Sequence, residues 1–197
     1  MIKAIIFDCF GVFIGNPYKL RAQALDQSDP EKGKLLHDIN RASDRGYLSR
    51  DETAKQMAEL IGISTEQFLA EQDKGEIRDE DLVAYVKTLR PQFKLAMLSN
   101  ISSRERLELR FEQGQLDELF DVVVASGDEG YIKPEPEIYE IALARLGVKP
   151  EECVMLDDIL EYCQGAEAVG LHAIQYFNLQ QAITDLNALI DRGGKTD

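Results

Sequence analysis

Five short, nearly continuous apolar runs recur along this chain of 197 residues, at positions 2–7, 95–98, 122–125, 154–156 and 173–176. A run of this kind is typical of a strand that is buried on both faces of a parallel sheet. Helical patterns follow the last four runs, at positions 103–113, 135–146, 162–169 and 178–190. This alternation predicts an α/β fold with a doubly wound parallel sheet.

One long segment, residues 16–90, interrupts the alternation directly after the first expected strand. It has no strand-like run, and Ser49 and Ser64 each begin a sequence that fits a helix capping box. We therefore expect a core of residues 1–15 and 91–197 and a helical insertion of residues 16–90. Because ligands of open α/β sheets bind outside the carboxyl ends of the strands, we interpret the insertion as a cap over a site. A helical lobe without a role is the alternative.

Charge and cysteine content indicate which partners and which cellular compartment suit this chain. The chain has 22 Lys and Arg against 36 Asp and Glu, a net charge of −14, which disfavours a nucleic acid partner. Its three cysteines show no CxxC spacing, which indicates free thiols in a reducing compartment. No apolar run approaches the roughly 20 residues that span a bilayer. We expect a cytoplasmic protein without a membrane partner, and these patterns specify no oligomeric state.

Polar residues follow four of the expected strands. Each has an ordinary interpretation as a helix cap, a turn former or a solvated side chain. Their shared location carries more weight, because the carboxyl ends of parallel strands meet at one edge of the sheet. The residues are Asp8, Ser99, Asn100, Lys133, Asp157 and Asp158.

This set has a consistent chemistry. Three carboxylates in one crevice repel each other, and a hard divalent cation such as Mg²⁺, which prefers oxygen ligands, relieves that repulsion. Lys133 and Ser99 provide a positive charge and a hydroxyl donor for the oxygens of a phosphate group. A remaining carboxylate can attack phosphorus as a nucleophile. Phosphoryl transfer requires mainly positioning and charge neutralisation, and this set provides both.

The segments FDCFGV, LSN, KPEPEIY and MLDD, in this order, resemble the four motifs of the haloacid dehalogenase superfamily, in its branch with a helical cap after the first strand. The resemblance implies that Asp8 is the nucleophile and that Ser99 and Lys133 bind phosphate, with Asn100 beside them. It also implies Mg²⁺ as a cofactor, held by Asp8, Asp157, Asp158 and the backbone carbonyl of Phe10, with Asp158 the more direct ligand of the acid pair.

Two residues depart from the pattern of the family. Its phosphatases usually have a second Asp, which protonates the leaving group, at the position of Phe10, and relatives commonly have Asn at the position of Tyr162. Some sugar-phosphate phosphatases of the family also lack that Asp. Their cap pattern resembles GYLSRDE, and the chain is similar to this subgroup. Arg41, Arg45 and Tyr47 flank Gly46 there and are candidates to contact a substrate, although such residues more often lie on the surface.

The sequence favours a Mg²⁺-dependent phosphatase that acts on a small phosphorylated metabolite through an aspartyl-phosphate. A 2-haloacid dehalogenase is the alternative within enzymes; Phe10 favours it, because dehalogenases of the family have an aromatic residue there, and the acid pair disfavours it. A third hypothesis is a pseudoenzyme that keeps the fold and binds a metabolite or a protein partner. Absence of the acid at position 10 would lower the rate by about 10²- to 10⁴-fold if nothing replaced it.

Overall fold

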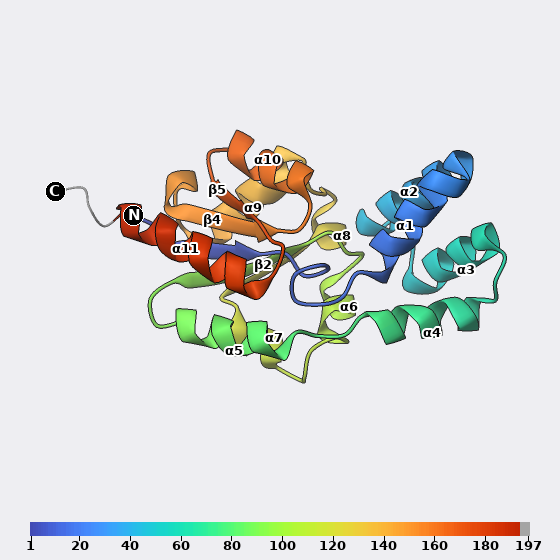
Figure 1. Ribbon diagram of the computed structural model, residues 1–197, viewed down its shortest axis with the longest axis horizontal. Helices are drawn as coiled ribbons and strands as arrows, with labels where there is room; N and C mark the ends of the chain where they lie inside the picture. The colour runs from blue at the N-terminus through green and yellow to red at the C-terminus, as the bar shows by residue number, and fades with distance from the viewer. Residues whose placement is uncertain (194–197) are drawn as a thin grey trace.

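The computed structural model describes residues 1–193, which form an α/β core and a group of inserted helices (Figure 1). The core sheet has the strand order β3-β2-β1-β4-β5, and every neighbouring pair is parallel. The five strands are β1 Ala4–Phe7, β2 Lys94–Ser99, β3 Val122–Ala125, β4 Cys153–Asp157 and β5 His172–Gln175. The predicted doubly wound α/β sheet is confirmed.

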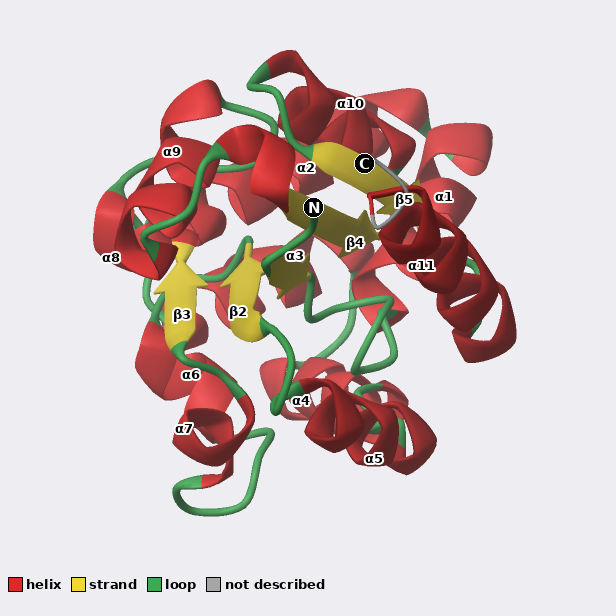
Figure 2. Ribbon diagram, turned by 90° about the vertical axis from the view of Figure 1, so that its left-hand side faces the viewer, coloured by secondary structure: helices red, strands yellow, loops and turns green. Residues whose placement is uncertain are grey.

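Helices cover both faces of this sheet (Figure 2). Alternate residues of a strand point to opposite faces, so Ile5 and Phe7 of β1 belong to one hydrophobic cluster and Ala4 and Ile6 to the other. The first cluster includes residues from α5 Glu80–Leu89, α6 Arg104–Glu108, α7 Gln115–Leu119 and α11 Leu179–Gly193. The second includes residues from α9 Pro136–Leu146 and α10 Leu160–Ala168. Two short elements, α8 Ser126–Glu129 and a 3₁₀ turn at Pro150–Glu152, complete the core.

The helix predicted at positions 103–113 is shorter than expected. Ser103 caps the start of α6 by accepting a hydrogen bond from the backbone N–H of Arg106, but α6 ends at Glu108. The chain then turns, and α7 begins after Gly114, whose φ of 79° lies outside the helical region. The apolar pattern of this segment reflects two short helices on one core face rather than one continuous helix.

Four inserted helices form the cap, and they pack around a small hydrophobic cluster of their own that includes Leu36, Met57 and Phe68. Figure 1 shows them together at the end of the molecule that lies opposite the N-terminus. Both helix starts expected from the sequence are present: Ser49 makes the full capping box with Glu52, and Ser64 caps the next helix. The helices are α1 Pro17–Ser28, α2 Pro30–Asp44, α3 Arg50–Ile61 and α4 Thr65–Gly75.

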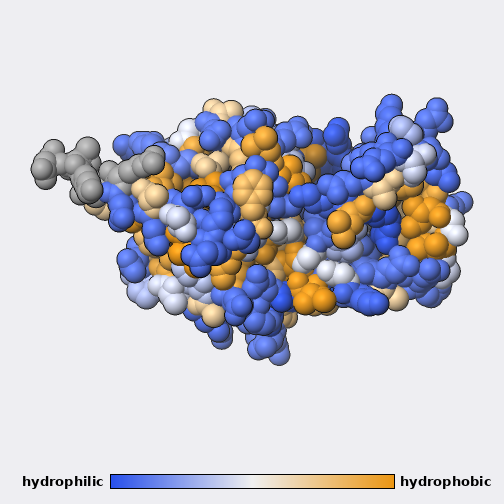
Figure 3. Space-filling view, in the orientation of Figure 1, coloured by the Kyte–Doolittle hydropathy of each residue, from blue (hydrophilic) through white to orange (hydrophobic). Residues whose placement is uncertain are grey.

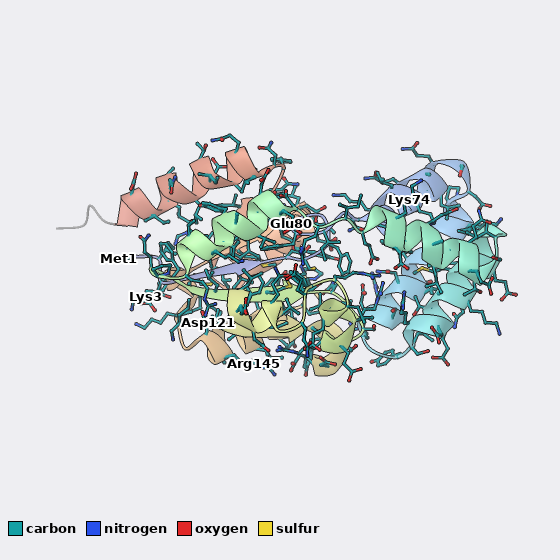
Figure 4. The ribbon with its side chains drawn as sticks, turned by 90° about the horizontal axis from the view of Figure 1, so that it is seen from below. Met1, Lys3, Lys74, Glu80, Asp121 and Arg145 are labelled. Atoms are coloured by element: carbon teal, nitrogen blue, oxygen red, sulfur yellow. The ribbon has the colours of Figure 1, made fainter. Side chains whose placement is uncertain are left out.

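Helix α5 differs from the other helices of the expected insertion 16–90. Its buried residues Leu82, Val83 and Val86 belong to the core cluster on the sheet, not to the cluster of the cap. In Figure 4, Lys74 lies on the cap and Glu80, the first residue of α5, lies on the core. Helix α5 therefore packs with the core, although its residues fall within the expected insertion 16–90, because its apolar face covers the sheet.

The turn after α2 holds the cap against the core. The hydroxyl of Ser126 donates a hydrogen bond to the backbone carbonyl of Asp44, and Arg45 pairs with Glu135. Gly46 has a φ of 76°, and a Cβ atom there would lie 2.6 Å from the carbonyl oxygen of Gly127. Only glycine allows the cap to approach the core backbone this closely.

Hydrophilic residues cover much of the face seen in Figure 3, with apolar residues exposed among them. This agrees with the high content of charged residues in the sequence. Within residues 1–193, none of the helices is both long enough and apolar enough to cross a bilayer.

Candidate active site

The polar residues predicted at the strand ends lie together at one edge of the sheet. Asp8 follows β1, Ser99 ends β2 and Asp157 ends β4, and β1 pairs with both of these strands. Lys133 reaches the same edge from the loop before α9. All four residues are buried, with at most 5% of each exposed. The fold therefore concentrates charge where it is poorly solvated.

Lys133 bridges two of the carboxylates. Its Nζ lies 2.8 Å from Asp8 Oδ1 and 2.6 Å from Asp157 Oδ2. Burial by itself lowers the pKa of Lys133, but the carboxylates of Asp157 and Asp8 outweigh it, and the pKa lies above its ordinary value. Asn100 accepts a hydrogen bond from the backbone N–H of Lys133 at 2.8 Å and donates one to its carbonyl at 3.1 Å. Asn100 thereby fixes the backbone that presents this lysine.

The protonation of Asp8 depends on its burial and on the charges around it. Its pKa is raised to about 7 in total: burial raises it most, the ammonium of Lys133 opposes this, and the carboxylates of Asp157 and Asp158 add to the rise. Burial likewise raises the pKa of Asp157. A positive charge added near these groups would favour their ionised forms, which is the state that a nucleophilic or metal-binding carboxylate requires.

The three carboxylates Asp8, Asp157 and Asp158 form a group that fits a cation. One oxygen from each lies within 4.8 Å of the others. Asp157 has both oxygens engaged, by Lys133 and by the backbone N–H of Ile159, whereas Asp158 Oδ1 is buried with no hydrogen-bond partner among the described residues. An all-oxygen donor set with an unpaired buried carboxylate oxygen suits a hard divalent cation.

Two neighbours fix the position of Asp158. Lys19 of cap helix α1 places its Nζ 2.5 Å from Asp158 Oδ2. On the other side, Gly11 has a φ of 93°, and a Cβ atom there would lie 2.4 Å from Asp158 Cγ. A side chain at position 11 would therefore displace this carboxylate.

A cavity of about 140 Å³ lies over these strand ends, between the core and the cap. The core contributes Asp8, Ser99 and Lys133, and the hydroxyl of Ser99 is buried without a partner within residues 1–193. Cap and hinge residues provide both polar and apolar lining. The polar ones include Asn16, Asn40, Asp44, Arg50 and Gln72, and the apolar ones include Met57, Phe68 and Leu69.

The two residues that depart from the family pattern both line this cavity. Phe10 is partly buried against the core cluster and brings no acid to the site. The ring centroid of Tyr162 lies 5.0 Å from Lys133 Nζ, and its hydroxyl accepts a hydrogen bond from Asn100 at 3.3 Å. Tyr162 thus contacts Lys133 and Asn100, which belong to the third and second motifs.

The structure also brings cap residues to the site that the sequence analysis did not identify. Lys19 contacts Asp158 and Asp44 lines the cavity, and Arg106 of core helix α6 lines it as well, whereas the candidates Arg41, Arg45 and Tyr47 do not. Arg45 instead pairs with Glu135, and Tyr47 is 72% exposed. One signal was available for Asp44: an acidic residue at the end of a helix is unfavourable beside the negative end of the helix dipole, and such local conflicts are common at functional sites.

Comparison with known sequences identifies relatives over most of the chain. A family model of haloacid dehalogenase-like hydrolases matches residues 2–170. The chain is 26% identical over 208 residues to acyl-CoA dehydrogenase family member 10 of Mus musculus. This alignment covers 95% of this chain and 19% of that protein. It is 33% identical over 113 residues to a phosphorylated carbohydrates phosphatase of Thermotoga maritima. This alignment covers 57% of this chain and 50% of that protein. The chain thus aligns with about a fifth and a half of these two relatives.

Solved structures share the fold. The HAD family enzyme bt-2542 of Bacteroides thetaiotaomicron, solved with magnesium and inorganic phosphate, has a TM-score of 0.71 at 21% identity over 90% of this chain and 95% of that one. The L-2-haloacid dehalogenase of Xanthobacter autotrophicus has a TM-score of 0.61 at 22% identity over 95% and 83%. At these identities the likeness is one of fold. The family model and the four motifs together show that the chain belongs to the haloacid dehalogenase-like hydrolases.

Proposed function

We propose that this chain is a Mg²⁺-dependent phosphatase that hydrolyses a small phosphorylated metabolite through an aspartyl-phosphate on Asp8. The observation that carries the proposal is the ammonium of Lys133 between Asp8 and Asp157, beside a cavity that Asp8, Lys133 and Ser99 line and where the Ser99 hydroxyl has no partner among the described residues. Such an arrangement positions Asp8 as a nucleophile and provides the Lys133 ammonium and the Ser99 hydroxyl as donors for an anion.

The proposed reaction has two displacements at phosphorus. In the first, a carboxylate oxygen of Asp8 forms a bond to phosphorus, the bond from phosphorus to the leaving oxygen breaks, and that oxygen takes a proton. In the second, water attacks phosphorus, the bond to Asp8 breaks, and inorganic phosphate leaves. Lys133 and the Ser99 hydroxyl donate hydrogen bonds to the phosphate oxygens during both steps.

The metal belongs to the same proposal. Asp8, Asp157, Asp158 and the carbonyl of Phe10 would hold Mg²⁺, which neutralises negative charge on the phosphate and the carboxylates when bound. The unpaired Asp158 Oδ1 and the spacing of the three carboxylates support this assignment.

The cavity supports a small substrate. Its volume of about 140 Å³ leaves space for a compact molecule. Amide side chains such as Asn16, Asn40 and Gln72 line it and can bind hydroxyl groups. The similarity to a phosphatase of phosphorylated carbohydrates agrees with such a substrate.

The test is phosphate release from a panel of phosphorylated metabolites, with Mg²⁺ and with a chelator, by the wild-type chain and by Asp8→Asn. We expect turnover that requires Mg²⁺ and falls to background in Asp8→Asn, because the amide is not a nucleophile of comparable strength. Asp81→Asn, on the exposed face of α5, is the matched control and should behave as wild type. Substantial turnover by Asp8→Asn contradicts covalent catalysis through Asp8.

A dehalogenase remains the alternative, because Phe10 brings an aromatic side chain to the site and the fold matches a solved 2-haloacid dehalogenase. The acid pair Asp157 and Asp158 favours the phosphatase. Halide release from 2-chloropropionate without Mg²⁺ would establish the alternative. Retained Mg²⁺ binding without turnover of either substrate class would favour a pseudoenzyme that binds a metabolite or a protein.

A further inference from the structure

The proposed reaction leaves one proton without an assigned donor. A departing alkoxide oxygen needs a proton, and Phe10, the nearest residue after the nucleophile that faces the cavity, has none to give. The donor must therefore come from another part of the cavity lining. Two lining residues with carboxyl groups lie outside the group of three strand-end carboxylates: Glu76 and Asp44.

Glu76 is committed to the guanidinium groups beside it. It pairs with Arg106 and with Arg110, and its side chain is only 3% exposed. These ion pairs bind the Glu76 carboxylate to neighbouring side chains rather than to a ligand in the cavity. Tyr18 also lines the cavity, but burial raises the pKa of its hydroxyl above the ordinary value, and it hydrogen-bonds His37 Nδ1 at 2.8 Å.

Asp44 has a different environment. It is the last residue of α2, and the hydrogen bond from Ser126 to its backbone carbonyl ties it to the core. Its Oδ2 accepts a hydrogen bond from Asn40 Nδ2 at 2.7 Å, and no cation forms an ion pair with it among the described residues. Asp44 thus lines the cavity from a fixed element, and its carboxyl group has no neutralising ion pair among the described residues.

The charges around Asp44 decide its protonation. The pKa of Asp44 is raised to about 8 in total. Burial raises it most, the ammonium of Lys133 lowers it, the carboxylate of Asp8 raises it, and Arg106 lowers it least. Tyr18 of α1 and Tyr162 of α10 line the same cavity, and burial raises the pKa of each hydroxyl above its ordinary value, so both are neutral. The carboxyl group of Asp44 thus holds its proton near neutral pH, in the range where general acids are most effective.

We propose that Asp44 is the general acid of the reaction, a role that the cap supplies in place of the strand residue after the nucleophile. As Asp8 displaces the leaving group, the proton of the Asp44 carboxyl group passes to the departing oxygen, leaving Asp44 as a carboxylate. In the second step this carboxylate takes a proton from the attacking water, which restores the acid. The inference rests on the proposed phosphatase reaction.

The test compares leaving groups. Rates with Mg²⁺ are measured for a series from 4-nitrophenyl phosphate through phenyl phosphate to an alkyl phosphate, using wild type, Asp44→Asn and the matched control Asp38→Asn, which changes an exposed acid on the same helix. Asp44→Asn should lower the rate on the alkyl phosphate by about 10²- to 10⁴-fold and that on 4-nitrophenyl phosphate by less than about tenfold, because nitrophenolate departs without a proton. Asp38→Asn should match wild type.

The pH profile gives a second readout. The wild-type rate on the alkyl phosphate should fall as the pH rises through about 8, where Asp44 loses its proton, and this fall should be absent in Asp44→Asn. Asp44→Glu keeps an acid and should retain most of the wild-type dependence on the leaving group. It therefore tests the role even if the amide variant does not fold.

Each outcome is decisive. Equal losses on all leaving groups in Asp44→Asn, or no loss at all, would overturn the assignment, the first indicating a structural role. If Asp8→Asn abolishes turnover while Asp44→Asn leaves the dependence on the leaving group unchanged, Asp44 is not the acid but the proposed phosphatase stands. If Asp8→Asn retains turnover, the proposed reaction itself fails.

Discussion

The lysine at the centre of the site balances two buried negative charges. Lys133, Asp8 and Asp157 are all nearly inaccessible to solvent, and the lysine contacts both carboxylates. Removing one member of a buried ionic group leaves the other charges uncompensated. The free energy lost in this way is larger than the net stabilisation that the intact group provides. The stability and the chemistry of this site therefore depend on the same side chain.

We expect Lys133→Met to abolish turnover and to lower the free energy of unfolding by about 3–5 kcal/mol at pH 8. The loss should shrink at lower pH, because protonation of Asp8 and Asp157 removes the uncompensated charge. Urea unfolding at pH 8 and pH 5.5 measures both effects. Lys87→Met, an exposed residue of α5, is the control and should change stability little; an equal loss at both pH values for Lys133→Met would indicate a packing defect instead.

A substitution at position 10 tests whether a carboxyl group there can replace Asp44 as the general acid. In the background of Asp44→Asn, Phe10→Asp returns a carboxyl group to the lining of the same cavity. We expect it to restore part of the rate on alkyl phosphates, by up to about 10²-fold, and to change the rate on 4-nitrophenyl phosphate little. In the wild-type background the gain should be small, because Asp44 already provides the proton. A large gain in wild type and none in the double variant would contradict this arrangement.

At the scale of elements, the strands were predictable and the cap contacts were not. Buried parallel strands leave continuous apolar runs, and all five expected strands are present because both of their faces are covered. The strand-end residues followed from the same pattern, since the sheet fixes where its carboxyl ends meet. The positions of Lys19 and Asp44 depend on how cap helices pack against the core, and no local spacing in the sequence encodes that packing.

Helix α1 reaches from the cap to the carboxylates of the core through Lys19. Its ammonium lies 2.5 Å from Asp158 Oδ2, so it occupies an oxygen that a cation would also use. We expect Lys19→Gln to increase the affinity for Mg²⁺ several-fold, because a competing positive charge is removed. Isothermal titration calorimetry measures this affinity without turnover.

Lys34→Gln is the matched control for this variant, since Lys34 is exposed on α2 and should leave Mg²⁺ binding unchanged. An unchanged or weaker affinity in Lys19→Gln would mean that the lysine does not compete with the metal and serves instead to orient Asp158.

For the whole molecule, burial of acidic groups between the core and the cap makes stability depend on pH. Unfolded Asp has a pKa of about 3.9, whereas burial raises that of Asp8 to about 7 and that of Asp44 to about 8. These two groups therefore bind more protons in the folded chain than in the unfolded chain between about pH 4 and pH 8. By linkage, the stability that they contribute falls as the pH rises through that window and levels off above it.

Asp44→Asn should reduce this dependence, because an amide does not titrate. We expect the free energy of unfolding of wild type, measured by urea in the presence of a chelator, to decline from pH 5 to pH 8 more steeply than that of Asp44→Asn. The difference in slope should stay below about 1.4 kcal/mol per pH unit, the limit for one proton. Asp38→Asn should follow wild type, since Asp38 is exposed. Parallel curves for wild type and Asp44→Asn would show that Asp44 is already ionised at pH 5, which would also remove the basis for its role as the acid.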